Sequence, residues 1–256
     1  MKIVVLVKQV PDTEEERKLD LTTGLLDREA NEAVADEINE RALEVALRHK
    51  DGDKRSEIIV LSMGPADATK ALRKALSMGA DSAIHVVDDS LAGADIAATA
   101  AVLAAAAGQT GFDVLVAGNE STDGRGGVVP SMIAEHLGVP LLPSLDSVEI
   151  SGDSVSGQVS VEGASLTLHS EYPAIISVTE RAAEARFPNF KGIMTAKRKP
   201  LATLSLADLG VPIGDGASST VLQTAERPAR TAGKKIVDDG TAASELAEFL
   251  VAGRLI

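Results

Sequence analysis

The hydrophobic positions of the first half of the chain follow two alternating patterns. Continuous apolar runs, typical of strands covered on both faces, occupy residues 3–7, 57–63, 82–87 and 113–117. Between and around them, residues 32–49, 66–78, 94–107 and about 129–137 have helical periodicity. Strands that alternate with helices predict right-handed crossovers and a parallel sheet. We therefore predict an α/β fold with a doubly wound, mostly parallel sheet of the adenine-nucleotide-binding type.

The pattern changes after Pro143. Short apolar segments at 148–150, 154–161, 164–169 and 174–178 are separated by Ser-Gly-Asp and Glu-Gly turns, which are hairpin signals. We expect antiparallel strands added to the parallel sheet. Beyond Arg186 follow a loop with Pro, Gly and Lys, then a Gly/Ala/Ser-rich stretch, a basic tail at 227–236 and a final helix at 242–252. The chain thus divides into an α/β domain over 1–213 and a C-terminal arm over 214–256 that packs on another surface.

Composition narrows the function classes. The 256 residues are 45% hydrophobic, enough for a proper core, and contain no cysteine, which excludes disulfides, thiolate nucleophiles and zinc–thiolate sites. The net charge of −13 argues against nucleic acid as a partner. No apolar run approaches the ~20 residues that span a bilayer. The first residues run straight into a strand pattern without a signal-peptide layout, so we expect a cytoplasmic protein with no membrane span.

One loop is a candidate ligand site. In an open α/β sheet, ligands bind beyond the carboxyl ends of the strands, at the point where the strand order reverses. The loop from Gly118 to Val129 follows such a strand and is rich in glycine, so backbone amides could approach a phosphate near the positive end of the next helix. Arg125 could add a charged contact. A flexible surface loop explains the same composition equally well.

Other binding and catalytic signatures are missing from the sequence. There is no G-x-x-x-x-G-K-[ST], no G-x-G-x-x-G after the first strand and no G-x-S-x-G. The four histidines lie far apart along the chain and form no metal-spaced cluster. We predict no metal site, no catalytic residues and no enzyme activity.

The loop over residues 187–199 is unusual for this protein. It holds Phe187, Phe190 and Met194 beside four cations, in a chain with only 2% aromatic residues. An apolar anchor with a basic rim is typical of a docking site for acidic partners. Composition alone favours a simpler interpretation, a strand end with a solvated basic rim.

Short segments spread over the chain together resemble a known family. They are residues 5–12 (VLVKQVPD), 39–46 (NERALEVA), 62–66 (SMGPA), 75–81 (ALSMGAD), 118–124 (GNESTDG), 186–197 (RF to IMTAK) and 230–233 (RTAG). Each is weak alone, but in this order and spacing the sequence resembles the beta subunit of electron-transfer flavoproteins over nearly its whole length.

The resemblance implies a heterodimer with an alpha subunit that carries the redox FAD. It also implies that the C-terminal arm packs on this alpha subunit and that this chain holds a structural AMP. Matching by motif, together with the strand-end argument, gives the cofactor-binding residues: Leu6, Asp36, Glu37, Ile38, Asn39, Met63, Gly118, Asn119, Glu120, Ser121, Thr122, Asp123, Gly124, Arg125, Gly126, Gly127, Val128 and Val129. The loop ends Val128-Val129-Pro130 where many members have Gln-Thr-Gly, so the phosphate contacts differ.

The resemblance also implies that residues 186–199 form a recognition loop for flavin dehydrogenases. The partner-docking residues are then Phe190, Lys191, Ile193, Met194, Lys197, Arg198 and Lys199. Phe190 replaces a leucine of the family, and Thr13 stands where some members place a tyrosine against the flavin of the alpha subunit. Electrons would pass from the dehydrogenases through the alpha-subunit FAD to a quinone oxidoreductase or similar acceptor.

Two alternatives remain. Some family members bifurcate electrons and hold a second FAD in the same pocket; Thr122-Asp123-Gly124 resembles them, whereas Arg125-Gly126-Gly127 lacks their acidic and glutamine residues. AMP is therefore the preferred ligand. A stand-alone ATP-binding module of similar fold explains the α/β half but neither the basic arm nor the 187–199 loop.

Overall fold

The computed structural model describes residues 1–211 and 221–256. The chain forms two compact units, Met1–Leu222 and Gln223–Ile256. The boundary predicted between residues 213 and 214 lies outside the described residues.

The first unit is built on a seven-stranded sheet in the order β12-β5-β4-β1-β6-β11-β7, in which every neighbouring pair is parallel. The bounds are β1 Lys2–Leu6, β4 Glu57–Met63, β5 Ser82–Val86, β6 Val114–Gly118, β7 Leu141–Leu145, β11 Ala174–Val178 and β12 Leu201–Leu204. The chain adds β4 and β5 on one side of β1 and then places β6 on the other side. The strand order therefore reverses between β1 and β6, which is where such sheets bind ligands.

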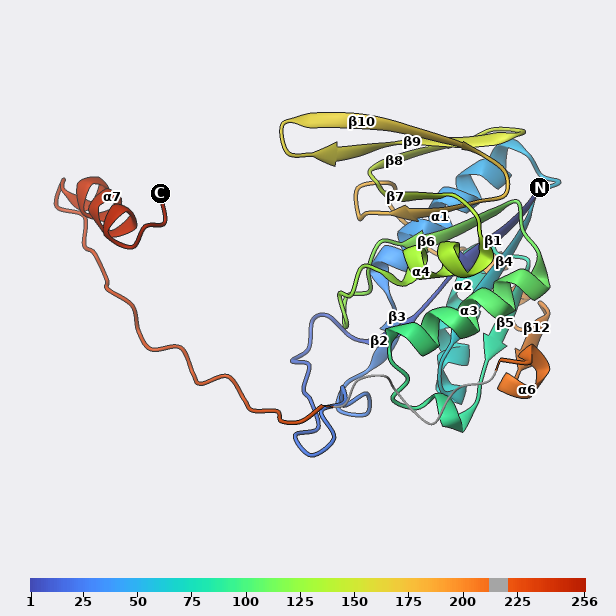
Figure 1. The fold of residues 1–256 in the computed structure, drawn as a ribbon, viewed down its shortest axis with the longest axis horizontal. Helices are drawn as coiled ribbons and strands as arrows, with labels where there is room; N and C mark the ends of the chain where they lie inside the picture. Colours follow the sequence, from blue (N-terminus) through green and yellow to red (C-terminus); the bar gives the residue numbers. More distant parts are fainter. Residues whose placement is uncertain (212–220) are drawn as a thin grey trace. The chain divides into compact units, whose positions relative to one another are not determined.

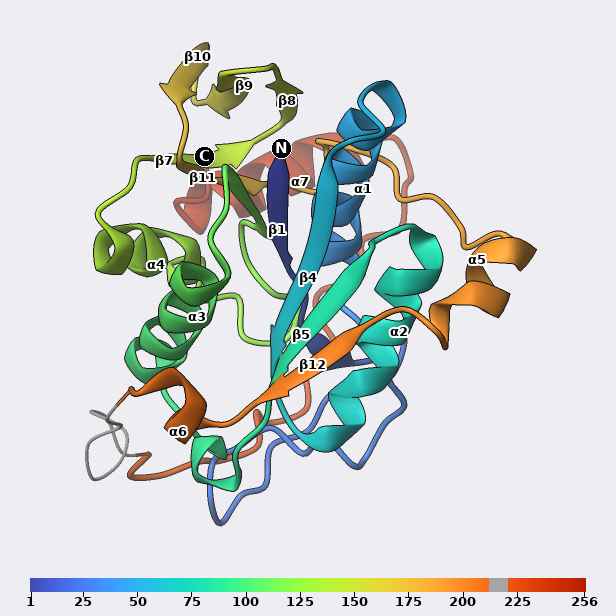
Figure 2. The ribbon, with the colours of Figure 1, turned by 90° about the vertical axis from the view of Figure 1, so that its right-hand side faces the viewer.

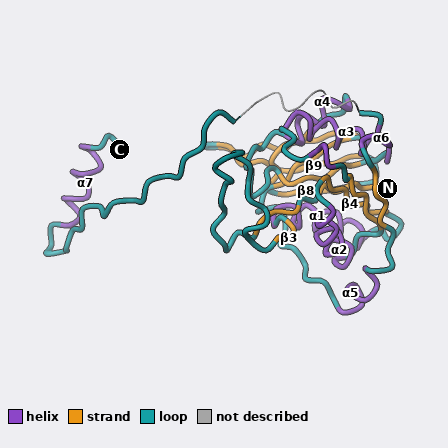
Figure 3. Tube along the Cα trace, turned by 90° about the horizontal axis from the view of Figure 1, so that it is seen from below, coloured by secondary structure: helices purple, strands orange, loops and turns teal. Residues whose placement is uncertain are grey.

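Helices cover both faces of the sheet, as Figures 2 and 3 show. One face carries α1 (Glu37–Gly52) and α2 (Thr69–Met78); the other carries α3 (Ile96–Thr110), α4 (Val129–Leu137) and the short α6 (Leu206–Leu209). Two short 3₁₀ turns, η1 (Ala66–Ala68) and η2 (Asp89–Leu91), precede α2 and α3. Each face of the sheet has its own apolar core. The predicted doubly wound α/β fold is confirmed.

The helix predicted over 32–49 begins later than expected. Residues Ala33–Ala35 form a strand, β3, which pairs antiparallel with β2 (Gln9–Pro11). Asp36 then has an extended backbone and caps the helix by accepting from the amides of Ile38 and Asn39. The prediction was wrong for the residues before Asp36, because their apolar side chains also fit the helical period of α1.

The antiparallel strands are not added to the large sheet. Strands β8 (Ser147–Ile150), β9 (Ser154–Val161) and β10 (Ala164–Glu171) form a separate three-stranded sheet, visible along the upper edge of this unit in Figure 1. In contrast, β11 lies in the large sheet, parallel to both neighbours and buried at every position. Our assignment of β11 to the antiparallel group was therefore wrong, since its unbroken apolar run is the pattern of a central parallel strand.

Besides α6, two helices follow β11 in the described part of the chain. Within the loop predicted at 186–199, residues Phe190–Ala196 form the helix α5, which lies beside α2 (Figure 2). In the second unit, α7 spans Ala242–Ala252 as predicted. Its side chains Leu246, Phe249 and Val251 are each more than half exposed. Across residues 1–211 and 221–256, none of the helices combines the length and hydrophobicity of a membrane span.

Candidate functional site at the strand-order reversal

The site begins where β1 and β6 end, next to the start of α1. Gly118 is the last residue of β6. A β-carbon at this position would lie 2.6 Å from Nδ2 of Asn39 and 3.0 Å from Cγ2 of Ile38. Only glycine lets the strand end come this close to the helix, so the sequence needs Gly118 to bring the following loop to the amino end of α1.

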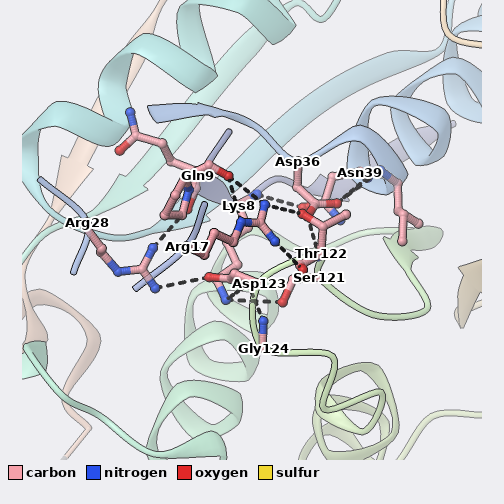
Figure 4. Close-up of polar contacts among 12 residues, drawn as sticks. Lys8, Gln9, Arg17, Arg28, Asp36, Asn39, Ser121, Thr122, Asp123 and Gly124 are labelled. Carbon is pink, nitrogen blue, oxygen red and sulfur yellow. Dashed lines mark hydrogen bonds and ion pairs between the residues drawn. The ribbon is translucent and has the colours of Figure 1, made fainter. Parts of the chain in front are cut away.

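Asp36 joins that loop to the helix. Its side chain is fully buried, and Figure 4 shows it between α1 and the loop. It accepts from the amides of Ile38 at 3.0 Å and Asn39 at 3.3 Å, and from the amide and hydroxyl of Thr122 at 2.7 and 2.8 Å. The buried carboxylate thus satisfies donors from two segments at once, which fixes the loop on the helix.

Asp123 forms a second buried centre of charge in the loop. Its side chain is 2% exposed, and its two oxygens accept from Lys8 Nζ at 2.7 Å and from Arg28 Nη2 at 3.2 Å (Figure 4). Burial raises the pKa of Asp123. The hydrogen bond and charge of Lys8, with the Ser121 hydroxyl and the Gly124 amide, outweigh burial and lower this pKa to about 2. Asp123 is therefore a carboxylate at neutral pH and holds the two cations in place.

Two arginines connect residues 12–32 to the loop. Arg17 donates to the carbonyl oxygen of Thr122 and, at 3.1 Å, to its hydroxyl; Arg28 also donates to the Gln9 carbonyl at 3.3 Å. Sequence analysis missed Lys8, Arg17 and Arg28. Their partners lie far away in the sequence and the arginines stand in a polar segment without periodicity, so the sequence contains no signal for them.

After these contacts, a distinct set of groups remains for a ligand. The side-chain oxygen of Asn119 is buried and has no hydrogen-bond partner among the described residues. In the same part of the structure, no side chain caps the first turn of α4, while Gly126 and Gly127 are exposed beside it. Arg125 is exposed, with its guanidinium 3.9 Å from Glu120. A buried amide oxygen without a partner, a helix start without a side-chain cap and an exposed cation fit a phosphate-bearing ligand with an amino group.

The remaining predicted cofactor residues fall in three places. Leu6 is buried at the end of β1, and Met63 is half-buried at the end of the neighbouring β4. Val129 packs against the core under α3 and α4, whereas Val128 is exposed. Glu37 is exposed in the first turn of α1. The structure thus gathers the ends of β1 and β6, the start of α1 and the 118–129 loop at one edge of the sheet.

The predicted docking residues form a separate surface on α5. Phe190 is 79% exposed, Met194 62% and Ile193 53%, and the neighbouring Phe187 is 94% exposed. Lys191, Lys197 and Arg198 are exposed around them and have no ion-pair partner in the described part of the chain. Together, Phe187, Phe190, Ile193, Met194 and these three cations are called the α5 surface below.

Lys199 differs from the other predicted docking residues. It is half-buried, and its ammonium group donates to the carbonyl oxygens of Leu76 at 2.9 Å and Ala80 at 2.6 Å. Burial lowers its pKa, against the charge of Asp81. Its side chain therefore holds the end of the loop on α2 instead of facing solvent.

Comparison with known proteins adds an independent observation. The sequence model of the "Electron transfer flavoprotein domain" family matches residues 23–209. The chain is 48% identical to the electron transfer flavoprotein subunit beta of Mycobacterium leprae, over 99% of both chains. It is 34% identical to the subunit of the same name from Megasphaera elsdenii, over the full length of both. It is also 33% identical to the CarD subunit of the caffeyl-CoA reductase–Etf complex of Acetobacterium woodii, over 98% of this chain and 97% of that one.

Proposed function

The chain belongs to the electron transfer flavoprotein family, as a beta subunit, and from this premise we propose that it binds AMP in the 118–129 loop and docks flavin dehydrogenases through the α5 surface. The alpha subunit of the heterodimer holds the FAD that accepts and passes on electrons. This chain makes and breaks no bonds; it supports the alpha subunit in the cytoplasm and brings electron donors to it. A quinone oxidoreductase or similar acceptor receives the electrons.

The observation that supports AMP most strongly is the set of groups around the 118–129 loop that remain available to a ligand: a buried oxygen without a partner, a helix start without a side-chain cap, and an exposed cation. The amides of Gly126 and Gly127, the amino end of α4 and Arg125 would hold the phosphate. The side-chain oxygen of Asn119, buried without a partner among the described residues, would accept from a donor on the nucleotide. Leu6 and Met63, at the ends of neighbouring strands, would lie against the apolar base.

The side chains of Ser121, Thr122 and Asp123 have a different part in this proposal. Ser121 and Asp123 bond to Lys8, and Thr122 bonds to Asp36. They would shape the loop before the nucleotide arrives, which leaves backbone amides as the main contacts to the phosphate. We favour AMP over a second FAD because residues 125–127, Arg-Gly-Gly, lack the acidic and glutamine residues of FAD-binding members.

The nucleotide proposal is tested by titration. The purified heterodimer is stripped of its nucleotide and titrated with AMP, ADP and FAD by calorimetry. We expect one site with the tightest binding for AMP. Tightest binding of FAD at a site that is lost in an Asn119→Ala variant of this chain would contradict the AMP assignment and favour a bifurcating flavoprotein.

The docking proposal depends on the chemistry of the α5 surface. In a protein of net charge −13, exposed Phe187, Phe190 and Met194 stand among cations that have no ion-pair partner in the described structure. Apolar anchors with a charged rim are typical of interface centres, where the anchor fills a pocket and the charges steer encounter. The partner should therefore present an apolar pocket with an acidic rim.

Phe190→Ala tests this docking role. We expect the variant heterodimer to show a raised KM in electron transfer from a flavin dehydrogenase that reduces the wild type, with the same flavin spectrum and AMP content. Leu166→Ala is the matched control, because Leu166 is a 47% exposed apolar residue on β10, outside the α5 surface. Loss of flavin in Phe190→Ala would assign Phe190 to subunit assembly and contradict the proposal.

We further propose that the C-terminal arm packs on the alpha subunit. The helix α7 exposes Leu246, Phe249 and Val251 within its own unit, and such an apolar face is stable in water only when another surface covers it. A heterodimer lacking residues 223–256 should dissociate at lower concentrations than the full-length one in analytical ultracentrifugation. Unchanged dissociation would contradict this role.

A further inference from the structure

We propose that the α5 surface is preformed: α2 and α1 hold α5 in its binding shape before any partner arrives, and Gly192 makes this possible. The inference rests on the proposed docking function of α5. It assigns positioning roles to residues that do not face the partner, namely Arg186, Gly192, Lys199 and, on α2, Arg73.

The first support lies where the chain enters the docking segment. Arg186 donates from Nε and Nη2 to the two carboxylate oxygens of Glu44, at 2.7 and 3.0 Å, and from Nη2 to Asp51 at 2.8 Å. The Glu44 side chain is 6% exposed. A two-pronged contact between a guanidinium and a buried carboxylate fixes both position and orientation. The residue before Phe187 is therefore anchored to α1.

The second support lies where the segment ends. Arg73 donates from Nη1 to the carbonyl oxygens of Ala196 at 2.8 Å and Lys199 at 2.9 Å. In the opposite direction, Lys199 donates to the carbonyl of Leu76 in the last turn of α2 and to that of Ala80, two residues beyond the helix. These charged donors satisfy carbonyl groups on both helix ends, so the last turn of α5 is fixed on α2.

The third support is the close approach of the two helices at Gly192. A β-carbon there would lie 2.1 Å from the carbonyl oxygen of Ser77 and 3.2 Å from its carbonyl carbon. The obstacle is backbone, which cannot swing away like a flexible side chain. Any residue larger than glycine must therefore lift α5 from α2. Within α5, the Gly192 amide donates to the Asn189 side chain at 2.7 Å, which caps the helix at its start.

These contacts determine how the apolar residues are presented. Phe190, Ile193 and Met194 are spaced as neighbours on one side of a helix, away from Gly192. A seven-residue helix is too short to be stable by itself in water, so its shape depends on the contacts to α1 and α2. Because α5 is already held in its binding shape, complex formation does not carry the entropic cost of ordering it. Loosening α5 should therefore weaken docking without slowing electron transfer in the docked complex.

The experiment compares Gly192→Ala with Gly152→Ala in the full alpha–beta heterodimer. Gly152 is the matched control because a β-carbon there meets nothing within 4 Å among the described residues. Arg73→Ala is a second variant that releases the end of α5 without adding volume, and it tests the proposal even where Gly192→Ala does not assemble. Phe190→Ala reports on docking itself. The measurements are amide hydrogen exchange of residues 190–197 in the free heterodimer, nucleotide content, and KM and kcat with the flavin dehydrogenase.

We expect both Gly192→Ala and Arg73→Ala to speed exchange in α5 and to raise KM, with kcat and AMP content unchanged. For Gly192→Ala, the exchange rate and KM should each rise on the order of tenfold. Gly152→Ala should match the wild type. If Phe190→Ala raises KM but neither Gly192→Ala nor Arg73→Ala changes exchange or KM, the preformed surface is wrong and the docking function stands. If Phe190→Ala leaves KM unchanged, the docking function itself fails.

Discussion

The carboxylate of Asp36 accepts two hydrogen bonds from Thr122, one from its backbone amide at 2.7 Å and one from its hydroxyl at 2.8 Å. Since Asp36 also caps α1, one buried side chain determines where the helix starts and where the 118–129 loop lies. The candidate nucleotide site therefore depends on a contact between residues 86 positions apart.

Removing this carboxylate should lower both the unfolding free energy and the amount of bound nucleotide. Asp36→Ala leaves the Thr122 amide and the amide of Ile38 buried without their acceptor, so we expect the unfolding free energy to fall by about 3 kcal/mol. Urea denaturation of the heterodimer measures this change. Ser205→Ala removes the cap of the short helix α6 and should cost only about 1 kcal/mol. Equal losses in the two variants would show that the Asp36–Thr122 contact adds nothing beyond ordinary capping.

Two glycines of the site should respond differently to substitution. In Gly118→Ala the new β-carbon meets Asn39 and Ile38, so both stability and bound AMP should decrease. Gly126 is exposed, and a β-carbon added there would meet only the flexible side-chain end of Ile96, at 3.1 Å. Gly126→Leu should therefore lower bound AMP while the unfolding midpoint stays near the wild-type value. Unchanged AMP content in Gly126→Leu would refute the assignment of this loop to the phosphate.

The ion pairs of Asp123 predict a specific acid response. Its folded-state pKa, about 2, lies below the ordinary value of 3.8, so the stabilisation it provides is complete above 3.8 and is lost as the pH falls through about 2. The stability difference between wild type and Asp123→Asn should therefore shrink as the pH is lowered from 5 to 2. Urea denaturation at a series of pH values measures the difference. A difference that stays constant over this range would show that these ion pairs do not lower the pKa of Asp123 in the folded state.

The buried base His85 also has a lowered pKa, which gives a second prediction about pH. It is 1% exposed beneath α2, and burial lowers its pKa below 6.5, against the pull of the Gly64 and Pro65 carbonyls. In an NMR titration, the signal that disappears in His85→Gln should have its midpoint below 6.5. The neutral ring stabilises the fold above pH 6.5, and this contribution is lost as the pH falls through the lowered pKa. A midpoint at or above 6.5 would contradict the buried, neutral state.

The sequence predicted the centre of the fold better than its edges. Continuous apolar runs identify β1, β4, β5 and β6 because central parallel strands are covered on both faces. The strands that pattern analysis missed in the large sheet, β7 and β12, are its two edges. Edge strands need less apolar sequence, and β7 even contains Pro143, which a central strand would not tolerate.

The site was predictable in outline but not in its internal contacts. Glycines after a strand and the reversal rule indicate the 118–129 loop, because strand ends and helix starts are local features. The pairing of Asp123 with Arg28 depends on how residues 12–32 fold back, and its pairing with Lys8 joins residues 115 positions apart, which no local pattern encodes. In the same way, Lys199 looks like a solvated cation in sequence, whereas tertiary packing turns it onto carbonyls in the last turn of α2 and just beyond it.

The most direct test of the central claim is a count of nucleotides. The chain is co-expressed with its alpha subunit, the purified heterodimer is denatured, and the released nucleotides are quantified by chromatography. We predict one FAD and one AMP per heterodimer, as expected for an electron carrier whose beta subunit holds a structural nucleotide. Two FAD and no AMP would contradict this account and make the beta-subunit pocket a second flavin site.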